Sequence, residues 1–354
     1  MNSRKKILIT GGAGYVGSRL VPQLLEKNYQ VKVYDLLFFG SNFLPKNHPH
    51  LEIIKGDIRD IELFKSQLKG IDVILHLACI SNDASFELDE KLSESINFDA
   101  FEPLVSEARQ AGVKRFVYCS SSSVYGVSKE KEVKEDHPLV PLTLYNKFKG
   151  MCEPILWKYN TKDFECVTIR PATIMGYAPR QRFDLSVNIL TNHAINNNKI
   201  TVFGGEQLRP NLHIQDMCNA YELFIEASGE KINGQTFNIG HQNYSIMQIA
   251  EVVRKVVQEE FPEKSSINIS TTTTDDIRSY HINSEKISKV LGFEPKFSIQ
   301  DAVKELCDAF KKDMLPDSLN KNIYFNVQRM NCLLYTSDAA DDTPCVDLGG
   351  RRII

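Results

Sequence analysis

Short apolar runs alternate with longer amphipathic stretches through the first half of the chain. Residues 7–9 and 31–34 have the length of buried strands, whereas residues 16–25 repeat apolar positions at helical spacing. Strands and helices in regular alternation predict an α/β fold with a Rossmann-type, doubly wound parallel sheet. The expected strands are residues 7–9, 31–34, 51–54, 73–77, 115–119 and 166–169, and the expected helices are residues 16–25, 61–68, 92–111 and 145–159.

The alternation loosens after Arg170 and Pro171, where helices dominate. This change predicts two interleaved units, a sheet domain over residues 1–170 and a smaller mixed α/β lobe over residues 171–315. Ligands of open α/β sheets bind at the carboxyl ends of the strands, so we expect the functional site in a cleft between the two units. The helices expected in the second unit are residues 185–195, 215–227, 245–257, 284–291 and 299–310.

The last stretch of the chain, residues 331–354, differs in character from the rest. It resembles the conceptual translation of a sequencing-library adapter, with Thr343 and Pro344 at the place of an index. We therefore leave it out of the fold prediction, as is done for fusion scars. The alternative is a natural flexible tail, and the codons of the gene distinguish the two origins.

Composition points to a globular protein with a small-molecule partner. The chain has 354 residues with 42% hydrophobic residues, and 42 basic residues against 45 acidic ones give a net charge of -3. No block of like charge indicates a nucleic-acid or membrane surface, and no apolar run approaches the roughly 18 residues of a membrane span. The eight cysteines show neither a disulfide framework nor metal-ligand spacing. We expect a cytoplasmic protein without a metal.

A glycine-rich turn joins the first expected strand to the first expected helix. Residues 10–17 read TGGAGYVG, which places Gly11, Gly14 and Gly17 three residues apart. Such glycines allow a tight turn, a close approach of backbone N–H groups to a pyrophosphate, and close packing of helix on strand. The alternative is a simple turn. The strand and helix on either side favour a dinucleotide site instead.

Asp35 narrows the identity of the dinucleotide. It ends the next apolar strand, where an acid accepts a hydrogen bond from the ribose 2′-hydroxyl. An acid there repels a 2′-phosphate, and Leu36 and Leu37 follow in place of an arginine. The pattern therefore predicts NAD rather than NADP. Asp57, after the third strand, is either an adenine contact or the cap of a loop.

Tyr145 and Lys149 are the candidate catalytic pair. They form a Tyr-X-X-X-Lys motif one helical turn apart, so both project from one face of the expected helix. A serine cluster, residues 120–123, follows the expected strand that ends at Cys119. The motif alone is common on solvated helix faces. Its order after a glycine loop and a serine cluster is far more specific.

This combination resembles the extended short-chain dehydrogenase/reductase family, in particular its nucleotide-sugar epimerase and dehydratase branch. The resemblance covers residues 6–310 and implies that Ser121 hydrogen-bonds the reacting sugar oxygen, with Tyr145 as base and Lys149 as its electrostatic partner. It also implies a homodimer. Further residues that match the family are His76, Leu77, Ala78, Asn97, Arg170, Pro171, Gly204, Gly205, Arg209, residues 213–216 and Arg278.

The same resemblance assigns contacts to the cofactor and to a nucleotide-sugar substrate. Arginines suit the substrate's phosphates because of their planar donors. The implied NAD contacts are Gly11, Gly14, Tyr15, Val16, Gly17, Asp35, Asp57, Ile58, Leu77, Ala78, Asn97, Tyr145 and Lys149. The implied substrate contacts are Ser122, Asn188, Arg209 and Arg278, whereas His213 and Asp216 are expected to shape and cap a helix.

The expected reaction is epimerisation through a transient keto-sugar. Tyr145 removes a proton from a sugar hydroxyl at C4 while hydride passes to the nicotinamide, and hydride then returns to the opposite face. The 4,6-dehydratases of the family carry an Asp-Glu pair where this chain has Ser122 and Ser123, so a dehydratase ranks lower. A reductase or dehydrogenase stays open, and a non-catalytic NAD-binding regulator is disfavoured because Tyr145 and Lys149 are both present.

A tyrosine base has an electrostatic requirement that this chain has to meet. Its reference pKa is near 10, so ionisation near neutral pH needs about three pKa units, or roughly 4 kcal/mol. One close cation such as Lys149 supplies about one to three units. The positive nicotinamide ring of oxidised NAD supplies the remainder, so we expect Tyr145 to be an effective base only with NAD bound.

Overall fold

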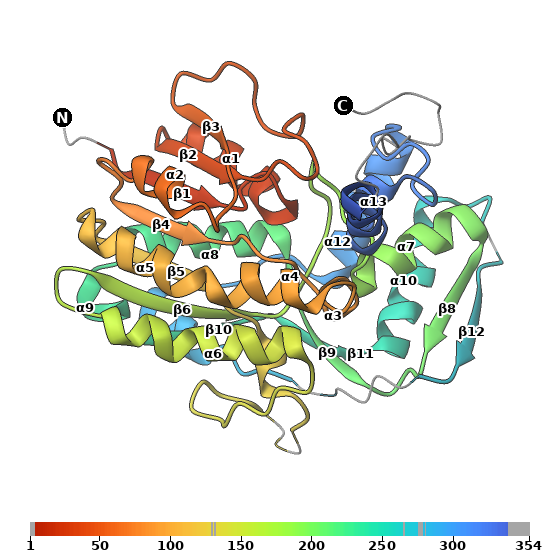
Figure 1. Ribbon diagram of the computed structural model, residues 1–354. Coiled ribbons are helices and arrows are strands. Elements are labelled where there is room, and N and C mark those ends of the chain that lie inside the picture. The colour runs from red at the N-terminus through yellow and green to blue at the C-terminus, as the bar shows by residue number, and fades with distance from the viewer. Residues whose placement is uncertain are drawn as a thin grey trace.

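Seven parallel strands form the central sheet of the computed structural model, with helices on both faces (Figure 1). The structure describes residues 4–128, 130, 132–264, 266–274, 279 and 281–338. The spatial order is β10-β6-β5-β4-β1-β2-β3, so the chain changes direction across the sheet between β1 and β4, where Rossmann-type sheets bind their ligands. The strands are β1 (Lys6–Thr10), β2 (Gln30–Asp35), β3 (Leu51–Lys55), β4 (Val73–His76), β5 (Arg115–Cys119), β6 (Glu165–Pro171) and β10 (Gln235–Ile239).

Successive side chains of each strand enter two different hydrophobic cores because both faces of the sheet are covered. Ile7 and Ile9 pack into the core on one face, whereas Leu8 between them packs into the core on the other. This double burial explains the apolar runs and confirms the predicted fold class. One face carries α1 (Tyr15–Glu26), α8 (Ile214–Glu226) and α11 (Glu285–Leu291), and the other carries α2 (Ile61–Ser66), α5 (Phe101–Gln110) and α6 (Leu144–Tyr159).

The single helix expected over residues 92–111 is divided into three segments. They are α4 (Glu90–Glu94), a π-helical turn (Ser95–Asp99) and α5. The π-helical turn contains Asn97, whose Oδ1 accepts a hydrogen bond from Ile80 N at 2.8 Å and whose Nδ2 donates to Ile80 O at 2.9 Å. Hydrophobic periodicity does not reveal this local widening, which often marks functional sites.

The second lobe has a core of its own, at the right of Figure 1. Its helices pack on a parallel pair of strands, and a three-stranded sheet runs between this core and the large sheet. The helices are α7 (Ser186–Asn197), α10 (Ile246–Glu260) and α12 (Ile299–Lys311). The parallel pair is β8 (Lys199–Phe203) and β12 (Asn268–Thr272), and the three-stranded sheet is β11 (Gln242–Ser245), β9 (Leu208–His213) and β7 (Thr173–Met175).

The two lobes are interleaved because β10, α8 and α11 return to the large sheet. Arg115 on β5 anchors α8 there. Its guanidinium donates to the carbonyls of Phe224 at 2.5 Å and Ala227 at 2.8 Å, and it also donates to Glu165 Oε2 at 2.6 Å. An arginine that binds the last carbonyls of a helix satisfies acceptors that have no partner within the helix. The boundaries 1–170 and 171–315 stay a prediction.

The remaining elements are short or lie near the end of the chain. They are α3 (Asp83–Phe86), α9 (Gly229–Ile232), two 3-10 turns (Ser122–Tyr125 and Asn322–Tyr324) and α13 (Asn326–Asp338). In Figure 1, α13 lies beside α3 at the rim where the two lobes meet. Of the predicted adapter-derived tail, residues 339–354 lie outside the described residues, and its origin stays a prediction. No helix within the described ranges is long and apolar enough to cross a membrane.

A buried ion pair connects α6 to the carboxyl end of β6. Tyr145, Lys149 and Glu153 follow one another at four-residue spacing, so they share one face of α6. Glu153 Oε2 lies 2.6 Å from Arg170 Nη2, and the two side chains are only 4% and 6% exposed. Ser120 Oγ donates to Glu153 Oε1 at 2.7 Å. The pair therefore fixes α6 against the serine cluster.

Arg170 extends this network to β10. Its Nη1 donates to Tyr125 Oη at 2.7 Å, and Tyr125 Oη donates in turn to Asn238 Oδ1 at 2.7 Å. Both partners are fully buried. The network thus joins the ends of three neighbouring strands, β5, β6 and β10. The ion pair of Arg170 with Glu153 stays intact within it.

We predict that Glu153→Gln lowers the free energy of unfolding by about 3 to 5 kcal/mol, because it leaves the Arg170 charge buried without its partner. Urea denaturation followed by circular dichroism measures this loss. Glu285→Gln is the matched control, since it removes an exposed helical pair with Lys289. It should leave the unfolding midpoint nearly unchanged. Equal midpoints for wild type and Glu153→Gln would contradict the assigned role.

His76, at the end of β4, is a second buried polar group. Its ring is 4% exposed and packs among the rings of Phe101, Phe116 and Tyr118. Its Nδ1 lies 2.8 Å from Thr10 Oγ1. Burial, with a smaller contribution from the charge of Lys149, lowers the pKa of His76 to about 3.

This shift predicts a loss of stability in acid. Below the unfolded pKa of about 6.5 the unfolded chain gains a proton that folded His76 does not accept, so stability falls as pH decreases toward about 3. Between about pH 6.5 and about pH 4 the loss is about 3 kcal/mol. His76→Phe should flatten this slope in urea titrations, whereas His50→Gln, on the surface, should not. An unchanged slope in His76→Phe would refute the prediction.

Candidate active site

A cavity of about 1180 Å³ opens at the carboxyl ends of the strands, between the two lobes. The glycine loop and the predicted catalytic residues all line it. The second lobe contributes residues from β8, β9 and α10. The cavity is therefore where the topology predicts a ligand site. Its lining includes Gly11, Gly14, Tyr15, Val16, Gly17, Asp35, Asp57, Ile58, Leu77, Ala78, Ser121, Ser122, Tyr145, Lys149 and Arg209.

The glycine loop cannot carry larger residues at two positions. Gly11 has φ +73°, and a Cβ there would lie 2.7 Å from Ala78 Cα. A Cβ at Gly17 would lie 2.2 Å from Gly12 O. Gly14 begins α1 and has no side-chain cap, and α1 has no acid in its first turn. The exposed N–H groups of this helix start fit a pyrophosphate.

Asp35 faces the cavity from the end of β2. Its Oδ2 accepts from Ala13 N at 2.9 Å, and its Oδ1 accepts from Leu37 N at 2.8 Å. Burial raises the pKa of this carboxyl, and the two backbone hydrogen bonds oppose the shift. The bonds fix the carboxylate so that its remaining lone pairs can accept ribose hydroxyls. This geometry fits the role predicted from the sequence.

Asp57 and Asn97 have internal partners. Asp57 Oδ2 lies 2.6 Å from Arg59 Nη2, and despite burial this arginine lowers the pKa of Asp57. The pair lies at the edge of the cavity, next to Ile58. Asn97 does not line the cavity, because both ends of its amide bind Ile80. It shapes the loop after β4, so its predicted contact with NAD has no direct geometric support.

Lys149 and Ser121 line the same cavity, and hydrogen bonds fix both side chains. Lys149 Nζ donates to Cys119 O at 2.7 Å, which ties it to the end of β5. Ser121 Oγ lies 2.7 Å from Ser123 Oγ, and Ser123 donates in turn to Asn146 Oδ1. The serine cluster is thus held by hydrogen bonds to α6, the helix that carries Tyr145 and Lys149. The three predicted catalytic residues share one cavity.

Tyr145 is in an environment that disfavours its charge. Burial raises the pKa of its hydroxyl well above the usual value, and Arg182 opposes this shift. Arg182 lines the cavity and lies 3.2 Å from Asp184 Oδ2 through its Nε. Burial therefore favours the protonated form of Tyr145.

Of the expected substrate residues, only two line the cavity among those described. Arg209 reaches it from β9, and Ser122, which is 2% exposed, lies at its wall. Asn188 is fully buried elsewhere. Its Oδ1 accepts from Gly176 N at 3.0 Å, and its Nδ2 donates to Tyr15 Oη at 3.0 Å. Arg278 lies outside the described residues.

Several lining residues were not expected from the sequence. Phe38 and Phe39 belong to the loop after β2, Ser81 follows β4, and Asn326 and Met330 belong to α13. No spacing or motif marks them. Asn326 and Met330 lie more than 120 positions after the lining residues of α7 in the sequence. Only the fold brings the two helices to the same site.

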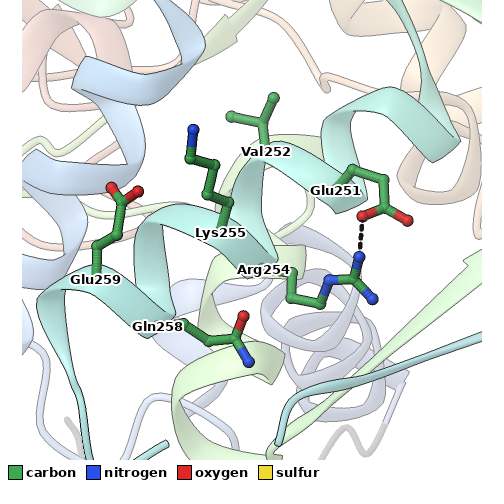
Figure 2. A pocket seen from close by; sticks show the side chains of 6 residues that line it. All are labelled: Glu251, Val252, Arg254, Lys255, Gln258 and Glu259. Atoms are coloured by element: carbon green, nitrogen blue, oxygen red, sulfur yellow. Dashed lines mark hydrogen bonds and ion pairs between the residues drawn. The ribbon is translucent and has the colours of Figure 1, made fainter. Parts of the chain in front are cut away.

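A second depression lies on the outer face of α10 (Figure 2). Five of the six side chains that line it are polar or charged, Val252 is the sixth, and Arg254 forms an ion pair with Glu251. All six residues come from one helix, and none lines the large cavity. This surface has the character of a solvated helix face.

Comparison with known proteins identifies the family. Residues 7–240 match the model of the NAD dependent epimerase/dehydratase family. The dTDP-D-glucose 4,6-dehydratase of Mus musculus is 29% identical over 325 residues, which cover 87% of this chain and 89% of that protein. The UDP-glucose 4-epimerase of Lactobacillus helveticus is 28% identical over 320 residues, which cover 84% and 94%.

A solved structure agrees with these relatives. The UDP-glucuronic acid 4-epimerase of Bacillus cereus, in complex with UDP-glucuronic acid and NAD, matches with a TM-score of 0.77 and 26% identity. The match covers 87% of this chain and 99% of that one. The glycine loop, Asp35 and the cavity fit the same dinucleotide. The chain belongs to the NAD-dependent epimerase/dehydratase family, within the extended short-chain dehydrogenases/reductases, and NAD is its cofactor.

Proposed function

We propose that the protein is a nucleotide-sugar epimerase that inverts C4 of the sugar through a transient keto-sugar, with Tyr145 as base. The observation that carries this proposal is the convergence of Ser121, Tyr145 and Lys149 in one cavity with the glycine loop and Asp35. A redox-neutral inversion needs one group that removes and returns a proton. It needs no separate acid for a leaving group.

The carboxylates that line the cavity support epimerisation over dehydration. Each of the four described ones already has a partner. Asp83 Oδ1 accepts from Thr143 Oγ1 at 2.5 Å, and Asp184 is paired with Arg182. Asp35 and Asp57 are engaged as described above. Loss of water requires an acid that protonates the leaving oxygen, and Ser122 and Ser123 are poor acids.

The first half of the proposed reaction is a deprotonation. Tyr145 Oη takes the proton of the C4 hydroxyl, while Ser121 Oγ hydrogen-bonds the same oxygen and stabilises it as it becomes a carbonyl. Lys149, held by Cys119 O, keeps its positive charge beside the phenolate. When bound, NAD supplies the hydride acceptor and later the hydride donor.

The second half returns the proton to the C4 oxygen and the hydride to the opposite face of C4. After the keto-sugar turns within the cavity, Tyr145 protonates the C4 oxygen as hydride reaches the other face of the carbon. Arg209, from β9, is placed to hold the diphosphate while the sugar moves, because a guanidinium binds phosphate through parallel donors. A fixed nucleotide with a mobile sugar is what inversion requires.

A sugar-nucleotide reductase or dehydrogenase is the second candidate, because the same three catalytic residues serve a net redox reaction. It differs in releasing its cofactor at each turnover, whereas an epimerase retains it. The expected homodimer and the cytoplasmic location stay predictions.

We predict that the purified protein interconverts one C4 epimer pair from a panel of UDP-, dTDP-, GDP- and CDP-sugars without net formation of NADH. Tyr145→Phe should lower kcat by about 10²- to 10⁴-fold, because it removes the proton-transfer group. Product stereochemistry by nuclear magnetic resonance and NADH absorbance provide the measurement.

Tyr159→Phe is the matched control. Tyr159 is on the same helix, at its far end, and its hydroxyl lies 3.2 Å from Glu102 Oε1. This variant should retain the wild-type rate. Full activity of Tyr145→Phe would eliminate the mechanism, a 4-keto-6-deoxy product would establish a dehydratase, and stoichiometric NADH would establish a dehydrogenase.

A further inference from the structure

Arg180 is a buried cation that lines the cofactor end of the cavity. It lies in the segment between β7 and α7, and its exposure is only 2%. Its backbone N donates to Ser18 Oγ at 3.1 Å, so the residue is docked on the first turns of α1. Ser18 is in the helix that begins at the glycine loop. A second-lobe arginine is thereby held beside that loop.

The guanidinium of Arg180 lies between two loops of the large sheet. Its Cζ lies 3.4 Å from the centre of the Phe39 ring, and its Nη2 donates to Asn326 Oδ1 at 2.6 Å. Asn326 Nδ2 donates in turn to Ser81 Oγ at 2.9 Å. Phe39 follows β2 and Ser81 follows β4, and β1 is the strand between them. The row from Phe39 to Ser81 therefore crosses above the end of β1, where the glycine loop lies.

The charge of Arg180 has no carboxylate in direct contact with it, because Asp184 and Asp35 attract it only from beyond ion-pair distance. Within the described ranges no carboxylate lies at ion-pair distance from it, and its buried Nε has no hydrogen-bond partner. The carboxylate of Asp184 is paired with Arg182. Burial, reinforced by the charge of Arg182, lowers the pKa of Arg180 to about 9, so the side chain is still charged at neutral pH. A buried cation with only neutral partners is costly unless a ligand supplies the anion.

We propose that the Arg180 guanidinium binds the pyrophosphate of NAD from the second lobe, on the side opposite the glycine loop. In a Rossmann-type sheet the pyrophosphate lies over the turn that follows β1, which is the turn that the row from Phe39 to Ser81 crosses. Two phosphate charges then have α1 on one side and Arg180 on the other. A guanidinium offers planar, bidentate donors for this contact, and stacking on Phe39 fixes its plane.

The proposed contact makes the cofactor a bridge between the lobes. Arg180 comes from the second lobe, and Asn326, which orients Nη2, comes from α13, so the cofactor is enclosed from three parts of the chain. Asn326 is a positioning residue in this arrangement. The inference depends on NAD binding alone and holds whichever reaction follows.

The test compares ligands that contain or lack the pyrophosphate. Full-length protein and Arg180→Gln are titrated with NADH by fluorescence, and the bound NADH is displaced with ADP-ribose, ADP, 2′-AMP and adenosine. Arg180→Gln should weaken NADH, ADP-ribose and ADP about 10- to 100-fold, the effect of one charge-assisted hydrogen-bond contact, while adenosine changes little. Arg180→Lys, which keeps the charge but not the planar fork, should fall between.

Arg19→Gln is the matched control for a purely structural role. Arg19 is on α1 and, like Arg180, links this helix to the second lobe: its Nη1 lies 2.5 Å from Glu305 Oε1, but it does not line the cavity. It should weaken all ligands equally or not at all. An equal loss for adenosine and ADP-ribose in Arg180→Gln, or unchanged ADP-ribose affinity, would overturn the proposal. A loss confined to 2′-AMP would place the guanidinium at the ribose and overturn it as well.

Discussion

The buried pair of Glu153 and Arg170 is the interaction on which the candidate active site depends. Glu153 is one helical turn beyond Lys149 and two beyond Tyr145, so the pair orients the reactive face of α6. Ser120, which binds the same carboxylate, brings the serine cluster to that face. A buried ion pair contributes little net stability on average, but losing one partner is costly. The main effect of this pair is on geometry, because it holds α6, the serine cluster and the end of β6 in one arrangement.

This arrangement places Tyr145 in a setting with opposing electrostatic demands. Burial raises the pKa of the phenol, while the proposed mechanism requires a phenolate. The charge of Arg182 acts against the shift, but the effect of burial is larger. The oxidised cofactor would add a positive charge to those of the protein. A base that forms only beside NAD would keep the site inactive until the hydride acceptor is present.

Much of the fold followed from the sequence, because local patterns determine it. Each expected strand was found, and the five helices expected in the second half lie within about three residues of the observed ones. Gly11 and Gly17 were predictable since close backbone contacts admit no side chain there. The strand β10 was not expected, because residues 235–239 are too few to show a pattern of apolar positions that separates them from the flanking residues. The π-helical turn was also missed, since it preserves the apolar pattern of a helix.

The site was predictable where a motif carries the chemistry and not where the fold brings distant residues together. Tyr145, Lys149 and Ser121 belong to a motif, and all three line the cavity. Asn188 was expected at the substrate, yet its amide is fully used by Tyr15, Gly176 and Arg182. Residue type alone does not separate a buried structural amide from a ligand contact. The stack of Arg180 on Phe39 and its bond to Asn326 join three remote segments, which no spacing rule connects.

Titration of Tyr145 with and without NAD shows whether the cofactor turns this residue into a base. Tyrosinate absorbance is followed against pH in the wild-type protein, and the same curves for Tyr145→Phe are subtracted to isolate this residue. We expect oxidised NAD to lower the apparent pKa of Tyr145 toward neutrality by about one unit or more, which is the effect of one close positive charge. The same titration curve with and without NAD would contradict it.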